Sequence, residues 1–289
     1  MTFLGLVGWY SNYHGESVLI FPELLKYLSI NEYVQDILGI CRQNLIDGAL
    51  SPALLDTAAD LLHRRFTEYT SAIQSLELEY GKKNWQYAER YAGLRQNLEL
   101  LVDVMSYGTA TRVLDDLALA VDNPDPRIAF SAIRLRILNN RPLPRAAVEK
   151  IARDPEMRNM LYIACRDWGR TADFPAAYAE HELLAESMLA GWCVASPELR
   201  QAPDEIAFGA PVQKARWHNS EAEYFVVFRF RMHEPHVAAQ RGWIAGVAQV
   251  LDYKGSISGN AMSALAAWDP DNVENYIAEF RDFLRRTKE

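Results

Sequence analysis

The feature that most constrains this chain is a succession of short amphipathic segments between residues 16 and about 195. In each segment the apolar residues recur at the i, i+3, i+4, i+7 spacing that places them on one face of a helix. A few residues rich in Asp, Asn, Pro or Gly separate the segments. The pattern predicts helices at 16–28, 31–47, 52–66, 85–105, 109–122, 125–139, 144–153, 155–168 and 174–193, with residues 70–80 either extending or following the third. No alternating strand pattern appears before about residue 220, which favours an all-helical first two-thirds.

The turns between these segments suggest a repeated unit. Asp125-Pro126, Asp154-Pro155 and Asp173-Phe174-Pro175 each precede a predicted helix. An Asp at the N-cap accepts a hydrogen bond from an otherwise unpaired backbone N–H, and Pro at the first helical position presets φ. Helix pairs joined by such connectors are typical of a stacked α-solenoid.

One stretch resembles a known repeat family. Residues 121–133, Val-Asp-Asn-Pro-Asp-Pro-Arg-Ile-Ala-Phe-Ser-Ala-Ile, follow a Leu/Ala-rich segment. They resemble the connector and second helix of a HEAT repeat, in which an Asp-Pro turn is followed by an Arg just inside the second helix. The resemblance is clearest over residues 109–170. It implies a HEAT-like helical repeat array, whose usual role is that of a scaffold with a concave protein-binding face.

After about residue 205 the pattern changes. Residues 226–232 alternate as in a half-buried strand, and residues 243–251 are more fully apolar, so we expect an antiparallel pair joined by a wide loop. Gly255 to Gly259 is expected to be a loop, and Asp269-Pro270 to begin a last helix. The predicted fold is therefore mainly α. Residues 1–205 form a HEAT-like α-helical repeat domain, and residues 206–289 form a small α+β cap, a β-hairpin plus helix, packed on the array.

Composition restricts the classes of partner. The 289 residues carry 30 Lys and Arg against 38 Asp and Glu, a net charge of −8, and no third of the chain is basic overall. Sequence-independent DNA binding usually needs a basic stripe, so nucleic acid is an unfavoured partner. The chain shows neither a signal peptide nor an apolar run long enough to cross a membrane. Cys41, Cys165 and Cys193 lie in apolar surroundings and are predicted to be buried free thiols, which fits a reducing cytoplasm.

The sequence contains no complete catalytic or metal-binding motif of the kinds considered. His233-x-x-His236 has a metal-ligand spacing, with Glu234 between, but Pro235 interrupts it and no helix presents both rings. Phosphate-binding loops and the GxSxG elbow are absent from the sequence. The acidic pairs Asp115-Asp116 and Glu180/Glu182 are predicted to lie on solvated helix faces. We therefore expect a non-enzymatic protein with no catalytic residue, metal or cofactor.

The middle third of the chain is rich in arginine. Arg127 and Arg134 are seven residues apart and share a predicted helix face, and Arg141 follows at the same interval. In a stacked array they would form a ladder, and Arg is the side chain that suits bidentate carboxylate recognition. The alternative is internal pairing with the acidic residues of the region. Trp168 and Arg170 add an aromatic and a cation at a groove rim, so the predicted partner-binding residues are Arg127, Arg134, Arg141, Trp168 and Arg170.

These features predict a protein–protein interaction scaffold that binds another, acidic protein in the groove of the array. Neutralisation of a toxin-like partner is one setting for such a scaffold. The alternative is a HEAT-like DNA-repair glycosylase or another nucleic-acid-binding helical repeat protein. A glycosylase would need a basic groove, an aromatic pair and an Asp, for which Trp168, Trp192 and Asp167 are the candidates. The net charge of −8 disfavours it.

Overall fold

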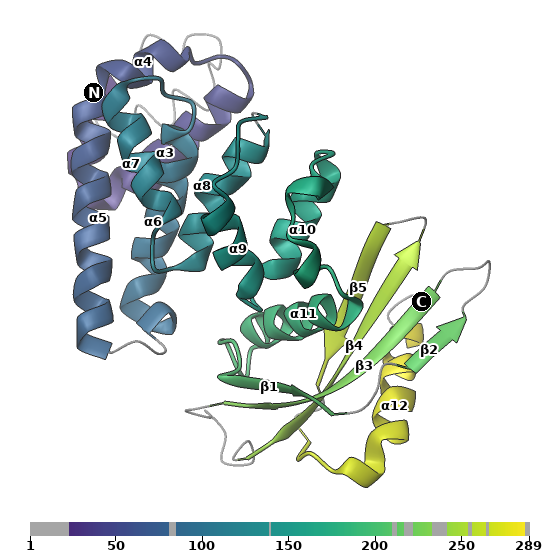
Figure 1. Cartoon of the computed structure of the whole chain (residues 1–289). Coiled ribbons are helices and arrows are strands. Elements are labelled where there is room, and N and C mark those ends of the chain that lie inside the picture. The colour runs from purple at the N-terminus through teal and green to yellow at the C-terminus, as the bar shows by residue number, and fades with distance from the viewer. Residues whose placement is uncertain are drawn as a thin grey trace. The chain divides into compact units, whose positions relative to one another are not determined.

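The computed structural model describes residues 23–80, 85–138, 140–209, 213–216, 222–232, 242–253, 256–263 and 266–286. The chain divides into two compact units, residues 1–142 and 143–289. The described part of the first unit is helical, and the second combines helices with a small antiparallel sheet and a C-terminal helix (Figure 1). The mainly helical fold predicted from the sequence is thus confirmed, whereas a boundary at residue 205 stays a prediction. Within the described residues, no helix is both long and apolar enough to cross a membrane.

The first unit is built around helix α6. Its described elements are η2 (Tyr27–Ser29, a 3-10 helix, as are all η elements), α3 (Asn31–Ile46), α4 (Pro52–Thr57), α5 (Ala59–Tyr80), η3 (Trp85–Tyr87), α6 (Glu89–Met105), α7 (Thr111–Val121) and α8 (Pro126–Leu138). α6 packs against α3, α5, α7 and α8, and its Leu98, Leu101 and Val102 are fully buried. Helices are confirmed in the ranges expected from residue 31 to 139, except that α4 and α5 are separated at Ala58 and that residues 85–87 form a 3-10 turn before α6. Most of the helix expected at 16–28 lies outside the described residues.

Polar contacts reveal the directions of these helices. Asp60 pairs with Arg112 at 2.5 Å and His63 with Asp116 at 2.9 Å, so residue numbers rise together and α5 and α7 run parallel. In contrast, α5 and α6 run antiparallel. Arg90 bonds to Glu79 and Asn97 to Tyr69, so residue numbers rise along α6 as they fall along α5. The hairpin of α5 and α6 therefore lies beside the hairpin of α7 and α8 (Figure 1). Its first helix, α5, runs parallel to the first helix of the other hairpin, α7.

The predicted inner face of α8 is confirmed. Asp125 accepts a hydrogen bond from the backbone N–H of Arg127 at 2.8 Å and so caps the start of the helix. The apolar side chains that the sequence assigned to this face are all buried, namely Ile128, Ala129, Ala132, Ile133 and Leu135. Ala132 itself is only 4% exposed.

We predict that Ala132→Asp lowers the free energy of unfolding by at least about 3 kcal/mol, because it buries a charge with no partner. Ala118→Asp is the matched control, since Ala118 is an exposed residue in the middle of α7. Urea denaturation followed by circular dichroism measures both variants. Equal stability of the two would show that Ala132 is not on a buried face.

The second unit begins with three helices and continues into a sheet. Its described elements are α9 (Arg145–Arg153), α10 (Arg158–Asp167), η4 (Thr171–Asp173), η5 (Ala176–Tyr178), α11 (His181–Ala195), β1 (Glu205–Phe208), β2 (Gln213–Arg216), β3 (Ala222–Arg231), β4 (Ile244–Tyr253), β5 (Ser256–Met262), η7 (Pro270–Asn272) and α12 (Val273–Arg286). The sheet order is β1-β3-β4-β5, and β2 also pairs with β3. All pairs are antiparallel.

The sheet partly corrects the sequence prediction. The antiparallel pairing of β3 and β4 is confirmed, with Val227 opposite Val247. The expectation of no strand before residue 220 is wrong, since β1 and β2 precede it. The loop expected at 255–259 is wrong from Ser256 onward, because β5 pairs there with β4. The predicted C-terminal cap thus contains a larger sheet than the single hairpin expected, followed by the expected helix.

Helices cover both faces of this sheet (Figure 1). On one face Gly246 of β4 lies against α11, where an added Cβ would come within 2.8 Å of Leu189. On the other face α12 closes a buried cluster of Phe225, Val227, Ala245, Val247, Tyr276, Ile277 and Phe280. The sheet is therefore the middle layer between α11 and α12.

We predict that a fragment of residues 1–210 aggregates, because it removes strands β4 and β5, which pack on α11 and lie against its fully buried Leu189. Fragments 1–142 and 143–289, cut between the two compact units, should each be monodisperse. Size-exclusion chromatography and binding of a dye specific for apolar surface distinguish these outcomes. A monodisperse, dye-negative 1–210 fragment would instead support a domain boundary near residue 205.

Candidate functional site

Helix α9 exposes a basic face. Its apolar residues Ala147, Val148, Ile151 and Ala152 are buried, and the opposite side is exposed: Arg145, Ala146, Glu149, Lys150 and Arg153. This face carries three cations and one carboxylate. Among the described residues, Arg145 makes no hydrogen bond or ion pair. α9 therefore presents a local excess of positive charge on a chain that is acidic overall.

Two open hollows flank this face. The larger, about 660 Å³, lies between α9 and the segment 172–178, and the smaller, about 480 Å³, lies along α9 as far as Pro155. Glu149 lines both, so they share one helix face. Small-ligand pockets typically measure about 300–1,000 Å³. We call the two hollows together the α9 cleft.

The wall opposite α9 is held by short-range contacts. Phe174 is buried and packs edge to face on Tyr162, with ring centroids 5.2 Å apart. The Arg170 guanidinium donates to Asp173 at 2.7 Å. Both Asp173 and Phe174 line the larger hollow. The cleft thus combines an apolar floor with a charged rim.

Arg158, which is buried, fixes the C-terminal end of α9. Its Nε donates to the carbonyl of Ala152 at 2.8 Å, and its Nη2 to that of Arg153 at 3.1 Å. These are carbonyls that a helix end leaves without an internal partner. Its Nη1 donates to Leu183 and, at 2.6 Å, to Glu186 of α11. One side chain therefore joins α9 to α11 and positions the cleft.

We predict that Arg158→Met destabilises the chain by about 3–5 kcal/mol, since it leaves a mostly buried carboxylate and several carbonyls without their donor. The control is Arg285→Met, because Arg285 lies exposed on α12 and should change stability by less than about 0.5 kcal/mol. Chemical denaturation measures both. Hydrogen exchange should accelerate first at residues 145–155, and unchanged exchange there would contradict this role of Arg158.

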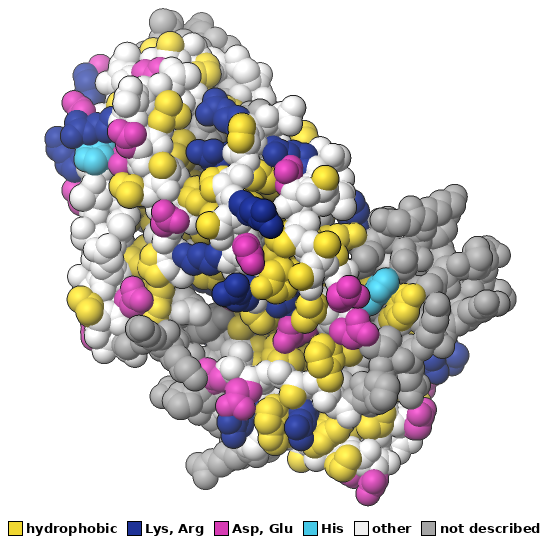
Figure 2. Space-filling view, in the orientation of Figure 1, with side chains coloured by type: hydrophobic (Ala, Val, Ile, Leu, Met, Phe, Trp, Pro, Cys, Tyr) yellow, Lys and Arg dark blue, Asp and Glu magenta, His cyan; other side chains and the backbone are white. Residues whose placement is uncertain are grey.

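Arg153 at the rim of the cleft bonds to the opposite wall. Arg153 donates from Nε to the Tyr178 hydroxyl at 3.2 Å, and this bond raises the pKa of Arg153. On the molecular face that Figure 2 shows, basic and acidic side chains are interspersed with hydrophobic ones. Mixed surfaces of this kind suit protein partners, whereas nucleic acid favours a continuous basic lining.

At least one of the three arginines of the predicted ladder forms an ion pair within the protein. Arg134 of α8 pairs internally with Asp103, at 3.1 Å. Arg127 is half-buried at the start of α8, and Arg141 is exposed beyond its end. Internal pairing, the alternative weighed from the sequence, therefore applies to Arg134. A charge reversal at Arg134 would place two carboxylates together and so would test folding.

Trp168 and Arg170 lie in the second unit. Trp168 follows the end of α10 with 56% of its surface exposed. Arg170 reaches the α9 cleft through its pairing with Asp173. The helix α9 was predicted from the sequence, but its basic face was not. The signal for that face is the spacing of Arg145, Lys150 and Arg153 around the apolar stripe of the helix.

One predicted solvated acid is buried. Asp116 of α7 receives a hydrogen bond from Nδ1 of His63 at 2.9 Å. Burial raises the pKa of Asp116, while the His63 bond acts in the opposite direction. In the described part of the chain, no Ser, Thr or Cys side chain bonds to His63. The pair therefore joins α5 to α7 and has no neighbouring nucleophile.

The described residues also contain no cluster of His, Cys, Asp and Glu that could hold a metal ion. His233, Glu234 and His236 lie outside the described residues. The three cysteines are buried and free, as predicted, and burial raises the pKa of Cys165 to about 11. A thiol of that pKa is a poor nucleophile near neutral pH.

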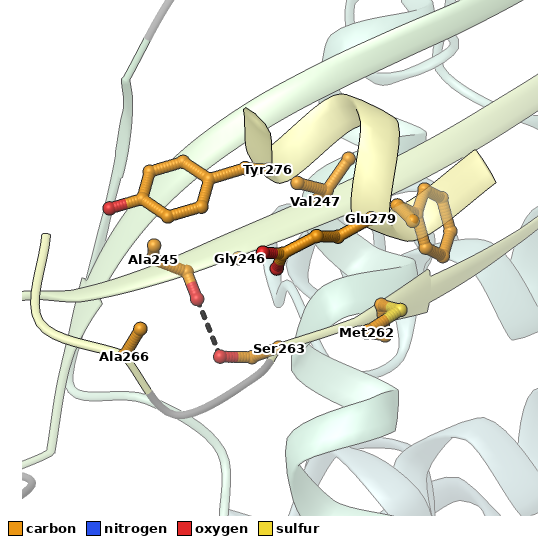
Figure 3. A pocket seen from close by; sticks show the side chains of 9 residues that line it. Ala245, Gly246, Val247, Met262, Ser263, Ala266, Tyr276 and Glu279 are labelled. Carbon is orange, nitrogen blue, oxygen red and sulfur yellow. Dashed lines mark hydrogen bonds between the residues drawn. The ribbon is translucent and has the colours of Figure 1, made fainter. Parts of the chain in front are cut away.

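A third cavity lies between the sheet and α12 (Figure 3). Tyr276 and Glu279 of α12 line it, and the Ser263 hydroxyl donates to the carbonyl of Ala245 at 2.5 Å. Its volume is about 20 Å³, which is room for about one water molecule. It is therefore a packing defect of the α12 layer and too small for a ligand.

Comparison with known proteins adds no relative. The chain matches no protein-family model, no curated protein and no solved structure.

Proposed function

We propose that this chain is a non-enzymatic interaction protein that binds an acidic segment of another protein in the α9 cleft. The observation that carries the proposal is the exposed face of α9, where Arg145, Lys150 and Arg153 stand with one carboxylate, Glu149, between two hollows that Asp154 and Asp173 also line. Charge complementarity of this kind selects partners and fixes their register. Arg145, which has no ion-pair partner among the described residues, is the cation on this face that an acidic segment would neutralise.

The lining of the cleft specifies the segment further. Val148 and Phe174 offer an apolar floor in the larger hollow, and Pro175 continues it. Lys150 and Arg153 line the smaller hollow. The segment we propose therefore carries an apolar side chain for the larger hollow and carboxylates beside it. Buried apolar anchors with a polar rim are the usual anatomy of such interfaces.

We further propose that α5–α8 stack as HEAT-like repeats that carry this site on a scaffold. The parallel course of α5 and α7 supports this, as does that of α6 and α8, where Tyr91 bonds to Asp125 and Asp103 to Arg134. Successive repeats in a solenoid stack corresponding helices in this way. Three buried free thiols fit the cytoplasmic setting of the proposal.

The test is a charge reversal in the cleft. Arg145→Glu with Lys150→Glu should weaken binding of the partner at least about tenfold, or ~1.4 kcal/mol, while leaving the fold intact. The partner is first recovered by affinity purification on the wild-type chain and identified by mass spectrometry. Titration calorimetry then measures both variants.

The control carries the same charge change elsewhere in the second unit. Arg285→Glu with Arg286→Glu alters two exposed residues of α12 and should bind the partner as the wild type does. Equal loss in both double variants would mean that only net charge matters. Salt-sensitive binding of duplex DNA that the cleft variant abolishes would favour the nucleic-acid alternative.

A further inference from the structure

Three charged side chains from three helices of the first unit form one cluster, in which two arginines bond to the carboxylate of Asp103. Asp103 of α6 accepts a hydrogen bond from Nε of Arg42, on α3, at 3.1 Å. It also accepts one from Nη2 of Arg134, on α8, at 3.1 Å to the same oxygen, Oδ2. The two donor nitrogens therefore lie no more than twice that distance apart. This cluster is separate from the α9 cleft, which belongs to the second unit.

The cluster has more donors than Asp103 can accept. Two guanidinium groups face one carboxylate, which leaves one positive charge. Nε of Arg134 is buried and has no hydrogen-bond partner among the described residues. Nη1 and Nη2 of Arg42 make no hydrogen bond within that same part of the chain. A buried donor without a partner is costly, and a bound water or ion commonly accounts for one.

We propose that Arg42 and Arg134 together bind an oxyanion, a phosphoryl or carboxylate group, beside Asp103. Asp103 is nearly buried, with 11% of its side chain exposed, whereas Arg42 and Arg134 are exposed at 40% and 37%. A ligand can thus reach the guanidinium groups from solvent. The planar fork of arginine matches the geometry of phosphate and carboxylate oxygens. Asp103 holds both forks in place before the ligand arrives.

This site does not depend on the proposed function. Loss of partner binding at α9 leaves the Arg42–Arg134 site intact, and failure of the oxyanion site leaves the α9 cleft unaffected. The two proposals are therefore tested by different residues and different probes.

The experiment follows the arginine Nε–H resonances of the ¹⁵N-labelled full-length chain. Arg134→Lys keeps the charge but removes one resonance, which assigns Arg134. Inorganic phosphate, exchanged for chloride at constant ionic strength, should shift the Arg134 resonance saturably in the wild type. A parallel titration with acetate tells whether a carboxylate group binds as well as, or in place of, a phosphoryl group.

Arg42→Gln should weaken the affinity for the binding anion at least about tenfold, since it removes one of two charged donors. Arg112→Gln is the matched control, because Arg112 forms an exposed pair with Asp60 in the same unit, and it should leave the affinity unchanged. An Arg134 resonance that neither anion moves beyond the effect of chloride overturns the proposal. Equal affinity in Arg42→Gln and the wild type overturns it also.

Discussion

Buried charged side chains satisfy backbone groups at several of the junctions between helices in this structure. Each short helix leaves N–H groups at its start and carbonyls at its end without internal partners. Asp125 accepts a hydrogen bond from the backbone N–H of Arg127 at the start of α8, at 2.8 Å. Asp154 accepts one from the backbone N–H of Glu156, in the turn before α10, at 2.9 Å. Arg158 supplies donors to the last carbonyls of α9. At these junctions charged side chains inside the fold satisfy backbone groups that the helices leave without partners.

The same constraint explains how the arginines divide between internal and external roles. Arg158 and Arg134 form ion pairs within the fold, since each meets an acid from another helix, Glu186 and Asp103 respectively. Arg145 meets no acid among the described residues. Sequence density alone does not separate these roles, because the acid that neutralises an arginine lies about 30 residues away in the chain, as at Arg158 and Arg134.

Much of the helical fold was predictable, because the 3.6-residue period and the Asp-Pro turns are local signals. Asp116 was not, because its neighbour Asp115 is exposed and only the approach of α5 decides which of the two is buried. The strand β5 was not predicted, because Gly259 is a residue typical of loops. Gly259 is required there, since an added Cβ would come within 2.0 Å of the carbonyl oxygen of Gln249. The α9 cleft was equally hidden, because residues 172–178 form its second wall.

Net charge and local charge act at different distances in this chain. The whole chain carries −8, so an acidic partner is repelled until it comes close. At physiological ionic strength screening limits this repulsion to about 8 Å. Within that range Arg145 faces a partner without an acidic neighbour among the described residues, and the apolar floor at Val148 and Phe174 adds contact that does not depend on charge. The binding that we propose for the α9 cleft would therefore rely on direct contact and an apolar anchor, with little long-range steering, and a highly charged segment lacking such an anchor would be a poor ligand.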